Sequence, residues 1–157
     1  LAARRRVALA DAARLARLAA VRPGVRTGAT GRAIQPQVES QRFSVVRDFS
    51  GHGLGRIFHD APNILHYGRA GTGPELRPGM FFTVEPMVNA GTWQVKILGD
   101  GWTAVTRDKQ LSAQFEHSVA ITETGVEFFT LSPKGLAKPP YGPPGEQMAT
   151  TRQAVSA

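Results

Sequence analysis

The sequence predicts an α+β domain in which helices come first and antiparallel strands follow. Apolar residues recur at helical spacing from Arg4 to Val21, and a second, shorter helical pattern runs from Gly31 to Gln41. From Met80 onward, apolar and polar residues alternate in short runs, which is typical of strands. Helices that are segregated from strands along a chain favour the α+β class over architectures in which the two alternate.

The first helix is predicted to be amphipathic and to end at the Arg-Pro-Gly-Val sequence of residues 22–25. Its predicted apolar face carries Ala8, Ala12, Leu15, Leu18 and Ala19, and the opposite face carries Arg6, Arg14 and Arg17. We expect these arginines to lie in solvent. In the second helix Ile34 and Val38 lie one turn apart, and Pro36 is expected to kink or shorten the helix.

Strands are predicted at Phe43 to Val46, which is a short apolar run, and in two later hairpins. Between them, the glycine-rich sequence SGHGLGRIFHDAPNILHYG, residues 50–68, predicts a structured loop. After Met80, two hairpins are indicated by turn residues at Asp100-Gly101 and around Glu123 to Gly125. The strands should therefore form an antiparallel sheet.

Composition places the chain among globular proteins with one ordinary domain, because it has 157 residues, of which 41% are hydrophobic and 20% charged. Cysteine is absent, which excludes disulfides and thiolate metal sites and leaves His, Asp and Glu as candidate ligands. No apolar run approaches the roughly 18 residues of a membrane span. We therefore expect no membrane association.

The net charge of +7 lies entirely within residues 1–42, where nine arginines stand against Asp11 and Glu39. A basic segment of this kind can attract nucleic acid, including ribosomal RNA, or can be a solvated helix face. At the other end, residues 133–157 are rich in Pro, Gly and small polar residues and predict a disordered tail. The folded domain is expected to span residues 1–132.

Five ionisable residues are candidates for chemistry. His52 and His59 lie in the glycine-rich loop, Glu85 lies in the apolar run FFTVEPMVNAG, and Glu116 and His117 lie on a later strand. A buried carboxylate needs a cation beside it, so Glu85 predicts an Arg, a Lys or a metal nearby. Strand alternation by itself places Glu116 toward solvent. The glycines match neither a P-loop nor a dinucleotide-binding motif.

Four segments together resemble the C-terminal half of a type I methionine aminopeptidase of the bacterial kind. They read FSVVRDFSGHGLG, GHGLGRIFHDAPNILHY, LRPGMFFTVEPMVNAG and DGWTAVTRDKQLSAQFEHSVAIT, in the order that the family shows. The resemblance implies the second half of a pita-bread (creatinase/aminopeptidase-like) fold, in which helices are followed by a curved antiparallel sheet. Residues 1–132 would then be the C-terminal portion of a catalytic domain.

The resemblance also implies a two-metal site. His52, Glu85 and Glu116 match metal ligands, with Glu116 bridging two divalent ions, which would be Co, Mn, Fe or Zn. His59 and Glu85 match catalytic residues, with Glu85 taking a proton from the attacking water. The resemblance further implies that His59, Phe58 and Trp102 bind the substrate.

The implied activity is removal of the initiator methionine from nascent proteins in the cytoplasm, with N-terminal methionyl peptides as substrates. Ribosome association through the Arg-rich helix is a further expectation. The family's two aspartate ligands have no match here, so we expect a fragment that binds at most one ion and is inactive by itself. The alternatives are a noncatalytic pita-bread protein that binds a partner and a degenerate relative that binds RNA.

Overall fold

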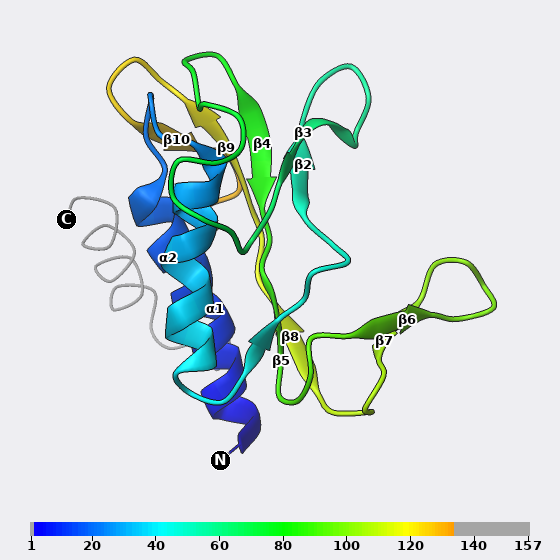
Figure 1. Cartoon of the computed structure of the whole chain (residues 1–157). Coiled ribbons are helices and arrows are strands. Elements are labelled where there is room, and N and C mark those ends of the chain that lie inside the picture. The colour runs from blue at the N-terminus through cyan, green and yellow to red at the C-terminus, as the bar shows by residue number, and fades with distance from the viewer. Residues whose placement is uncertain (1, 134–157) are drawn as a thin grey trace.

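The computed structural model describes residues 2–133, and two adjacent helices precede all the strands in it (Figure 1). Helix α1 spans Ala2–Ala20 and helix α2 spans Thr27–Glu39. The predicted α+β order is confirmed. Of the predicted tail, residues 134–157 lie outside the described residues. No helix within residues 2–133 is long and apolar enough to cross a membrane.

The strands form three antiparallel groups. The five-stranded sheet has the order β10 (Val126–Phe128), β9 (His117–Ile121), β4 (Phe81–Val84), β2 (Gly51–Gly53) and β3 (Asp60–Ile64). The three-stranded sheet has the order β1 (Ser44–Val45), β5 (Met87–Asn89) and β8 (Ser112–Gln114). The third group is the projecting hairpin of β6 (Val95–Ile97) and β7 (Ala104–Thr106) (Figure 1). Both predicted hairpin turns are confirmed.

Helix α1 contributes to two hydrophobic clusters, one under each of the larger sheets. Leu18 packs with Phe82 and Val84 of β4 and with apolar residues of β3 and β9. Leu9 packs with apolar residues of α2, β1 and β5. Phe82 and Val84 are fully buried. Because side chains alternate along a strand, Phe81, Thr83 and Glu85 point to the opposite side of the sheet.

Both central strands are interrupted at the same place. β4 ends at Val84, which is paired with His117, and β5 begins at Met87, which is paired with Gln114. The register is therefore continuous across the break, and it places Glu85 directly across from Glu116. One pair of chain segments thus leaves the five-stranded sheet and enters the three-stranded sheet at these two glutamates.

The predicted orientation of the first helix is wrong for two of its arginines and two of its alanines, although Leu18 is buried as expected. Arg14 and Arg17 are buried, with exposed fractions of 2% and 0%, whereas Ala8 and Ala19 are exposed. Arg14 forms an ion pair with Asp11 and lies over the ring of Phe115. The helix has alanine on both sides, so its hydrophobic pattern does not determine which side faces the core.

The burial of Arg17 is costly. Its guanidinium donates a hydrogen bond to the carbonyl oxygen of Leu65, but Nε and Nη2 have no partner. Burial lowers the pKa of Arg17 to about 9. A buried cation without an acidic partner for its remaining donors opposes folding.

Two further expectations need correction. Helix α2 begins at Thr27, four residues before the predicted Gly31, and runs through Pro36 to Glu39. Pro36 has no N–H to donate to the carbonyl oxygen four residues earlier, so it costs the helix one hydrogen bond but does not end the helix before Glu39. The segment 50–68, predicted as a loop, contains β2 and β3. The two strands lie so close together that a Cβ at residue 53 would lie 2.0 Å from the carbonyl oxygen of Ala61, and glycine, which has no Cβ, allows this pairing.

We predict that Arg17→Met raises the free energy of unfolding by about 1 kcal/mol or more at neutral pH, because it removes a buried charge and keeps similar volume. Chemical denaturation measures the change. Arg22→Met, at an exposed position, is the matched control and should change stability by less than about 0.5 kcal/mol. A loss of stability in Arg17→Met would contradict the argument.

We predict that Gly53→Ala destabilises the chain by about 2 kcal/mol, because the added methyl group meets the backbone of β3. Gly99→Ala is the control, since a Cβ there meets nothing within 4 Å. Thermal unfolding of the two variants should separate them clearly. Equal midpoints would show that β2 and β3 do not pack as closely as described.

Candidate metal centre

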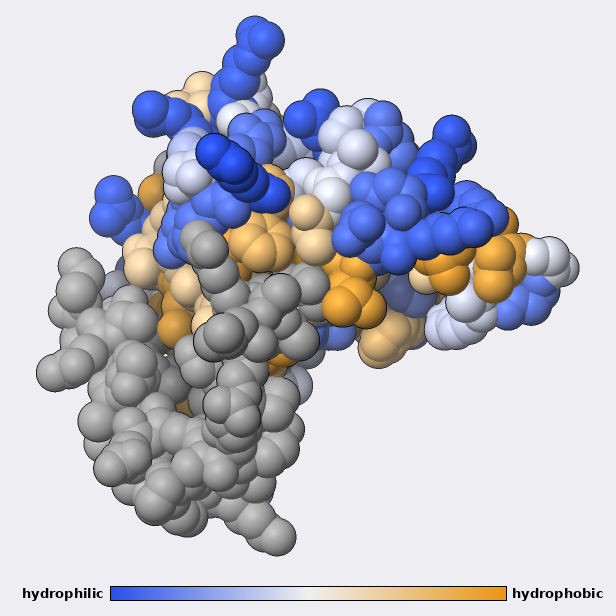
Figure 2. Space-filling model, turned by 90° about the horizontal axis from the view of Figure 1, so that it is seen from below, coloured by the Kyte–Doolittle hydropathy of each residue, from blue (hydrophilic) through white to orange (hydrophobic). Residues whose placement is uncertain are grey.

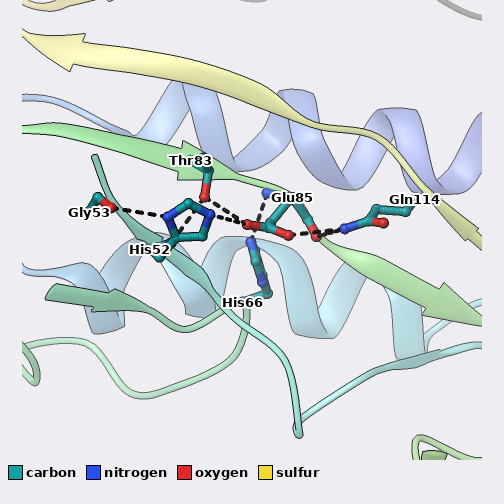
Figure 3. A network of polar contacts seen from close by, with 6 residues as sticks. All are labelled: His52, Gly53, His66, Thr83, Glu85 and Gln114. Carbon is teal, nitrogen blue, oxygen red and sulfur yellow. Dashed lines mark hydrogen bonds and ion pairs between the residues drawn. The ribbon is translucent and has the colours of Figure 1, made fainter. Parts of the chain in front are cut away.

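Glu85 lies at the end of β4 on the face opposite the hydrophobic cluster. Its side chain is only 14% exposed. Its backbone N–H lies at the strand break and donates to Nε2 of His66 over 3.0 Å (Figure 3). The next residue, Pro86, has no N–H and cannot join a ladder. The break in the strand therefore presents the Glu85 carboxylate away from the core.

Two side chains hold the Glu85 carboxylate. The Thr83 hydroxyl donates to Oε1 over 2.7 Å, and the Gln114 amide donates to Oε2 over 3.1 Å (Figure 3). The Thr83 hydroxyl also accepts a hydrogen bond from the backbone N–H of His52 over 3.0 Å. Because a hydroxyl has only one proton, this second contact leaves the Thr83 proton directed at Glu85.

His52 presents its ring nitrogen to the same carboxylate. Its Nδ1 lies 3.0 Å from the carbonyl oxygen of Gly53, and a carbonyl only accepts, so Nδ1 carries the proton of this hydrogen bond. In the neutral ring, Nε2 then has a lone pair, and it lies 3.6 Å from Oε1 of Glu85. Two electron-pair donors facing each other require a cation between them or a proton on one of the two.

The second carboxylate strengthens this requirement. Burial raises the pKa of Glu85, the Thr83 hydrogen bond lowers it, and the negative charge of Glu116 raises it again. His52 and His59 act in the opposite direction. Like charges directly opposite on paired strands are destabilising. Glu116 itself is exposed, as strand alternation suggested, yet its charge acts on Glu85.

His59 and Phe58 lie beside His52. The ring centroids of His52 and His59 are 4.4 Å apart, and those of His52 and Phe58 are 5.3 Å apart. Phe58 is nevertheless 69% exposed. The segment between β2 and β3 therefore brings two of the predicted substrate-binding residues next to the candidate ligands.

Trp102 is not brought to this cluster. It lies in the turn between β6 and β7 and is 84% exposed. Its backbone N–H donates to Asp100 in the same turn. Figure 2 shows further hydrophobic surface on the projecting hairpin, at the right of that view, where Ile97 and Leu98 are exposed. The substrate-binding role of Trp102 stays a prediction.

The side chains of His52, Glu85 and Glu116 fit a divalent ion, but only together with further ligands. Within residues 2–133, no group of three or more His, Asp or Glu side chains is arranged to hold a metal by itself. His52 and Glu85 already converge, and Glu116 lies across the strand pair. One imidazole and carboxylate oxygens suit the transition metals and zinc. A metal-bound imidazole also commonly donates its other N–H to a backbone carbonyl, as His52 does.

Sequence reasoning missed three residues of this network: His66, Thr83 and Gln114. His66 is 2% exposed, and burial, with a smaller effect of the Arg17 charge, lowers its pKa well below the ordinary value. Thr83 could have been found, because it lies on the same side of its strand as Glu85. Nothing in the sequence pattern distinguishes His66 from an ordinary core histidine.

Comparison with known proteins identifies the family. The model of metallopeptidase family M24 matches residues 2–123. The chain belongs to this family. Methionine aminopeptidase A of Synechocystis sp. is 62% identical over 112 residues, which are 71% of this chain and 44% of that protein. Methionine aminopeptidase of Rickettsia prowazekii is 60% identical over 122 residues, 77% of this chain and 47% of that protein.

Solved structures confirm the pita-bread (creatinase/aminopeptidase-like) fold of this M24 chain. The methionine aminopeptidase of Rickettsia prowazekii has a TM-score of 0.79 at 53% identity, covering 82% of this chain and 52% of that one. The prolidase of Pyrococcus furiosus has a TM-score of 0.62 at 22% identity, covering 82% of this chain and 32% of that one, and shows the fold alone. The chain spans about half the length of the curated relatives it matches.

We predict opposite pKa changes at Glu85 in two variants. Glu116→Gln removes a nearby negative charge and should lower the pKa of Glu85, whereas Thr83→Val removes a hydrogen bond to the carboxylate and should raise it. Carboxyl-carbon NMR titration of metal-free protein measures both. Asp100, whose pKa the Thr103 hydroxyl lowers, is an internal control and should not change. Shifts of the same sign in both variants would contradict the described geometry.

Proposed function

We propose that this M24 chain forms part of the catalytic site of a metal-dependent aminopeptidase that removes N-terminal methionine. The observation that carries the proposal is the convergence of the His52 lone pair on the Glu85 carboxylate, with Glu116 in register across the strands. Its close relatives over this region are named methionine aminopeptidases. A partner-binding module has no physical need for a carboxylate that faces an imidazole, with a second glutamate in register across the strands.

The divalent metal would be held by His52, Glu85 and Glu116. The metal would be Co, Mn, Fe or Zn. A bound ion would lower the pKa of the attacking water and would polarise the scissile carbonyl. The resemblance to the family implies two ions and two aspartate ligands in addition to these three residues. We propose that those aspartates come from outside residues 2–133.

Glu85 is suited to hold a proton during the reaction. A general base works best when its pKa lies close to the working pH, and burial raises the pKa of Glu85 in that direction. The Thr83 and Gln114 hydrogen bonds keep both carboxylate oxygens oriented while the proton is taken up. We therefore assign Glu85 two roles, as metal ligand and as base.

His59 is placed to act on the substrate. Its ring lies against His52, and its charge, when protonated, favours the ionised form of Glu85. An N–H of His59 would donate to the substrate carbonyl oxygen as charge develops there. Phe58, whose ring lies 4.8 Å from that of His59, would contact the methionine side chain. Trp102, which lies outside this cluster in the β6–β7 turn, is proposed as a further substrate contact from the family resemblance alone.

The proposed substrates are the N-terminal methionyl peptides of nascent proteins in the cytoplasm. The burial of Arg14 and Arg17 removes two positive charges from the surface that was expected to contact ribosomal RNA. Ribosome association through α1, and the RNA-binding alternative, thereby lose part of their basis. No described contact favours the noncatalytic alternative over the enzyme.

We predict that a chimera is an active aminopeptidase when this chain replaces the matching segment of the Rickettsia prowazekii methionine aminopeptidase. In that chimera, His52→Ala and Glu85→Ala should each lower the rate of methionine release by at least about a hundredfold, because each removes a metal ligand. The assay follows release of free methionine from a peptide that begins with Met.

Glu127→Gln is the matched control, since it removes an exposed carboxylate of β10 and should leave the rate unchanged. A folded chimera that releases no methionine would overturn the proposed activity. Full activity in Glu85→Ala would overturn the assignment of Glu85 as ligand and base. The 157-residue chain by itself is expected to bind at most one ion weakly and to release no methionine.

A further inference from the structure

The N–H of Glu85 lies where the ladder is interrupted. β4 ends at Val84 and β5 begins at Met87, so residues 85 and 86 are outside both sheets. A buried backbone N–H without an acceptor costs free energy comparable to a lost hydrogen bond. Some other group must accept this N–H if the strand is to bend here.

His66 is that acceptor. Its Nε2 lies 3.0 Å from the Glu85 nitrogen, and its ring is fully enclosed two residues beyond the end of β3 (Figure 3). An N–H can bond only to a lone pair, so Nε2 carries none of the ring's protons in this contact. β3 and β4 are separated by β2 in the sheet. The His66 side chain therefore connects the end of β3 to the break that follows β4.

We propose that His66 is a positioning residue for the metal centre: by accepting the Glu85 N–H, it fixes the backbone from which the Glu85 carboxylate faces His52. The inference rests on the proposed function, because it gives the hydrogen bond a role in that site. His66 contacts neither substrate nor reacting atoms and is not itself a catalytic residue.

The three hydrogen-bond partners of Glu85 divide the work between side chain and backbone. Thr83 and Gln114 orient the carboxylate through its two oxygens. Gln114 also donates to the backbone carbonyl oxygen of Glu85 over 3.3 Å, whereas His66 holds the N–H side of the same residue over 3.0 Å. Without His66, the Glu85 N–H has no partner at the strand break, and the carboxylate then loses its fixed distance to His52.

The test compares three variants of the full 157-residue chain. His66→Ala removes the acceptor, whereas His66→Gln keeps an acceptor oxygen at comparable reach. The control, His117→Ala, removes another buried imidazole, which bonds Thr130 and lies on the core side of β9. Amide hydrogen exchange of Glu85 is measured by NMR relative to the other amides of β4.

We expect exchange at Glu85 to accelerate by about tenfold relative to β4 in His66→Ala, to be largely restored in His66→Gln, and to be unchanged relative to β4 in His117→Ala. The proposal is overturned if Glu85 is unprotected in the unmodified chain, or if His66→Ala accelerates all β4 amides equally.

Binding of Mn²⁺, followed by paramagnetic broadening of the His52 and Glu85 signals, separates this inference from the proposed function. If His66 positions the site, His66→Ala should weaken Mn²⁺ binding by about tenfold and His66→Gln should recover most of it. Unchanged Mn²⁺ affinity in His66→Ala would overturn the positioning role. Absence of Mn²⁺ binding in the unmodified chain would count against the metal site and overturn the role of His66 in it.

Discussion

The opposition of Glu85 and Glu116 is the constraint on which the arrangement of the site depends. Continuous register across two interrupted strands puts these two residues directly opposite each other, and the negative charge of Glu116 raises the pKa of Glu85. Without a cation, the raised pKa of Glu85 means that the folded chain loses stability as pH rises through that pKa. A divalent ion bound by both glutamates would instead raise the free energy of unfolding, because it would bind the folded chain and not the unfolded one.

The two sides of the five-stranded sheet serve different purposes. Phe82 and Val84 face the helices and are fully buried, so they fix β4 in the core. Thr83 and Glu85, between and beyond them, face the other way and form the polar network. The same strand therefore anchors the fold and carries the site. Phe82 and Val84 are hydrophobic and pack against the helices, whereas Thr83 and Glu85 are polar and bond to each other.

The sequence predicted the elements whose signals are local and missed the features that depend on tertiary contacts. Turn residues at Asp100-Gly101 identified the β6–β7 hairpin, because a tight turn needs only its own residues. The face of α1 was misassigned, because alanines on both sides gave no preference and the neighbours of Arg17 come from distant segments. His52 and Glu85 were candidates from the sequence pattern, and the family resemblance gave each a role, whereas His66 is recognised only by the N–H that it accepts.

The close backbone contact of β2 has a consequence for how this protein can diverge. Any side chain at Gly51 would meet main-chain atoms of β4, and any side chain at Gly53 would meet those of β3. A substitution at either position would therefore move the neighbouring His52. The exposed segment with Phe58 and the turn with Trp102 carry no such restriction. Substitutions can therefore accumulate in these two segments, while the backbone that presents the imidazole of His52 stays constant. Positions that can vary and positions that cannot are thus separated along the chain.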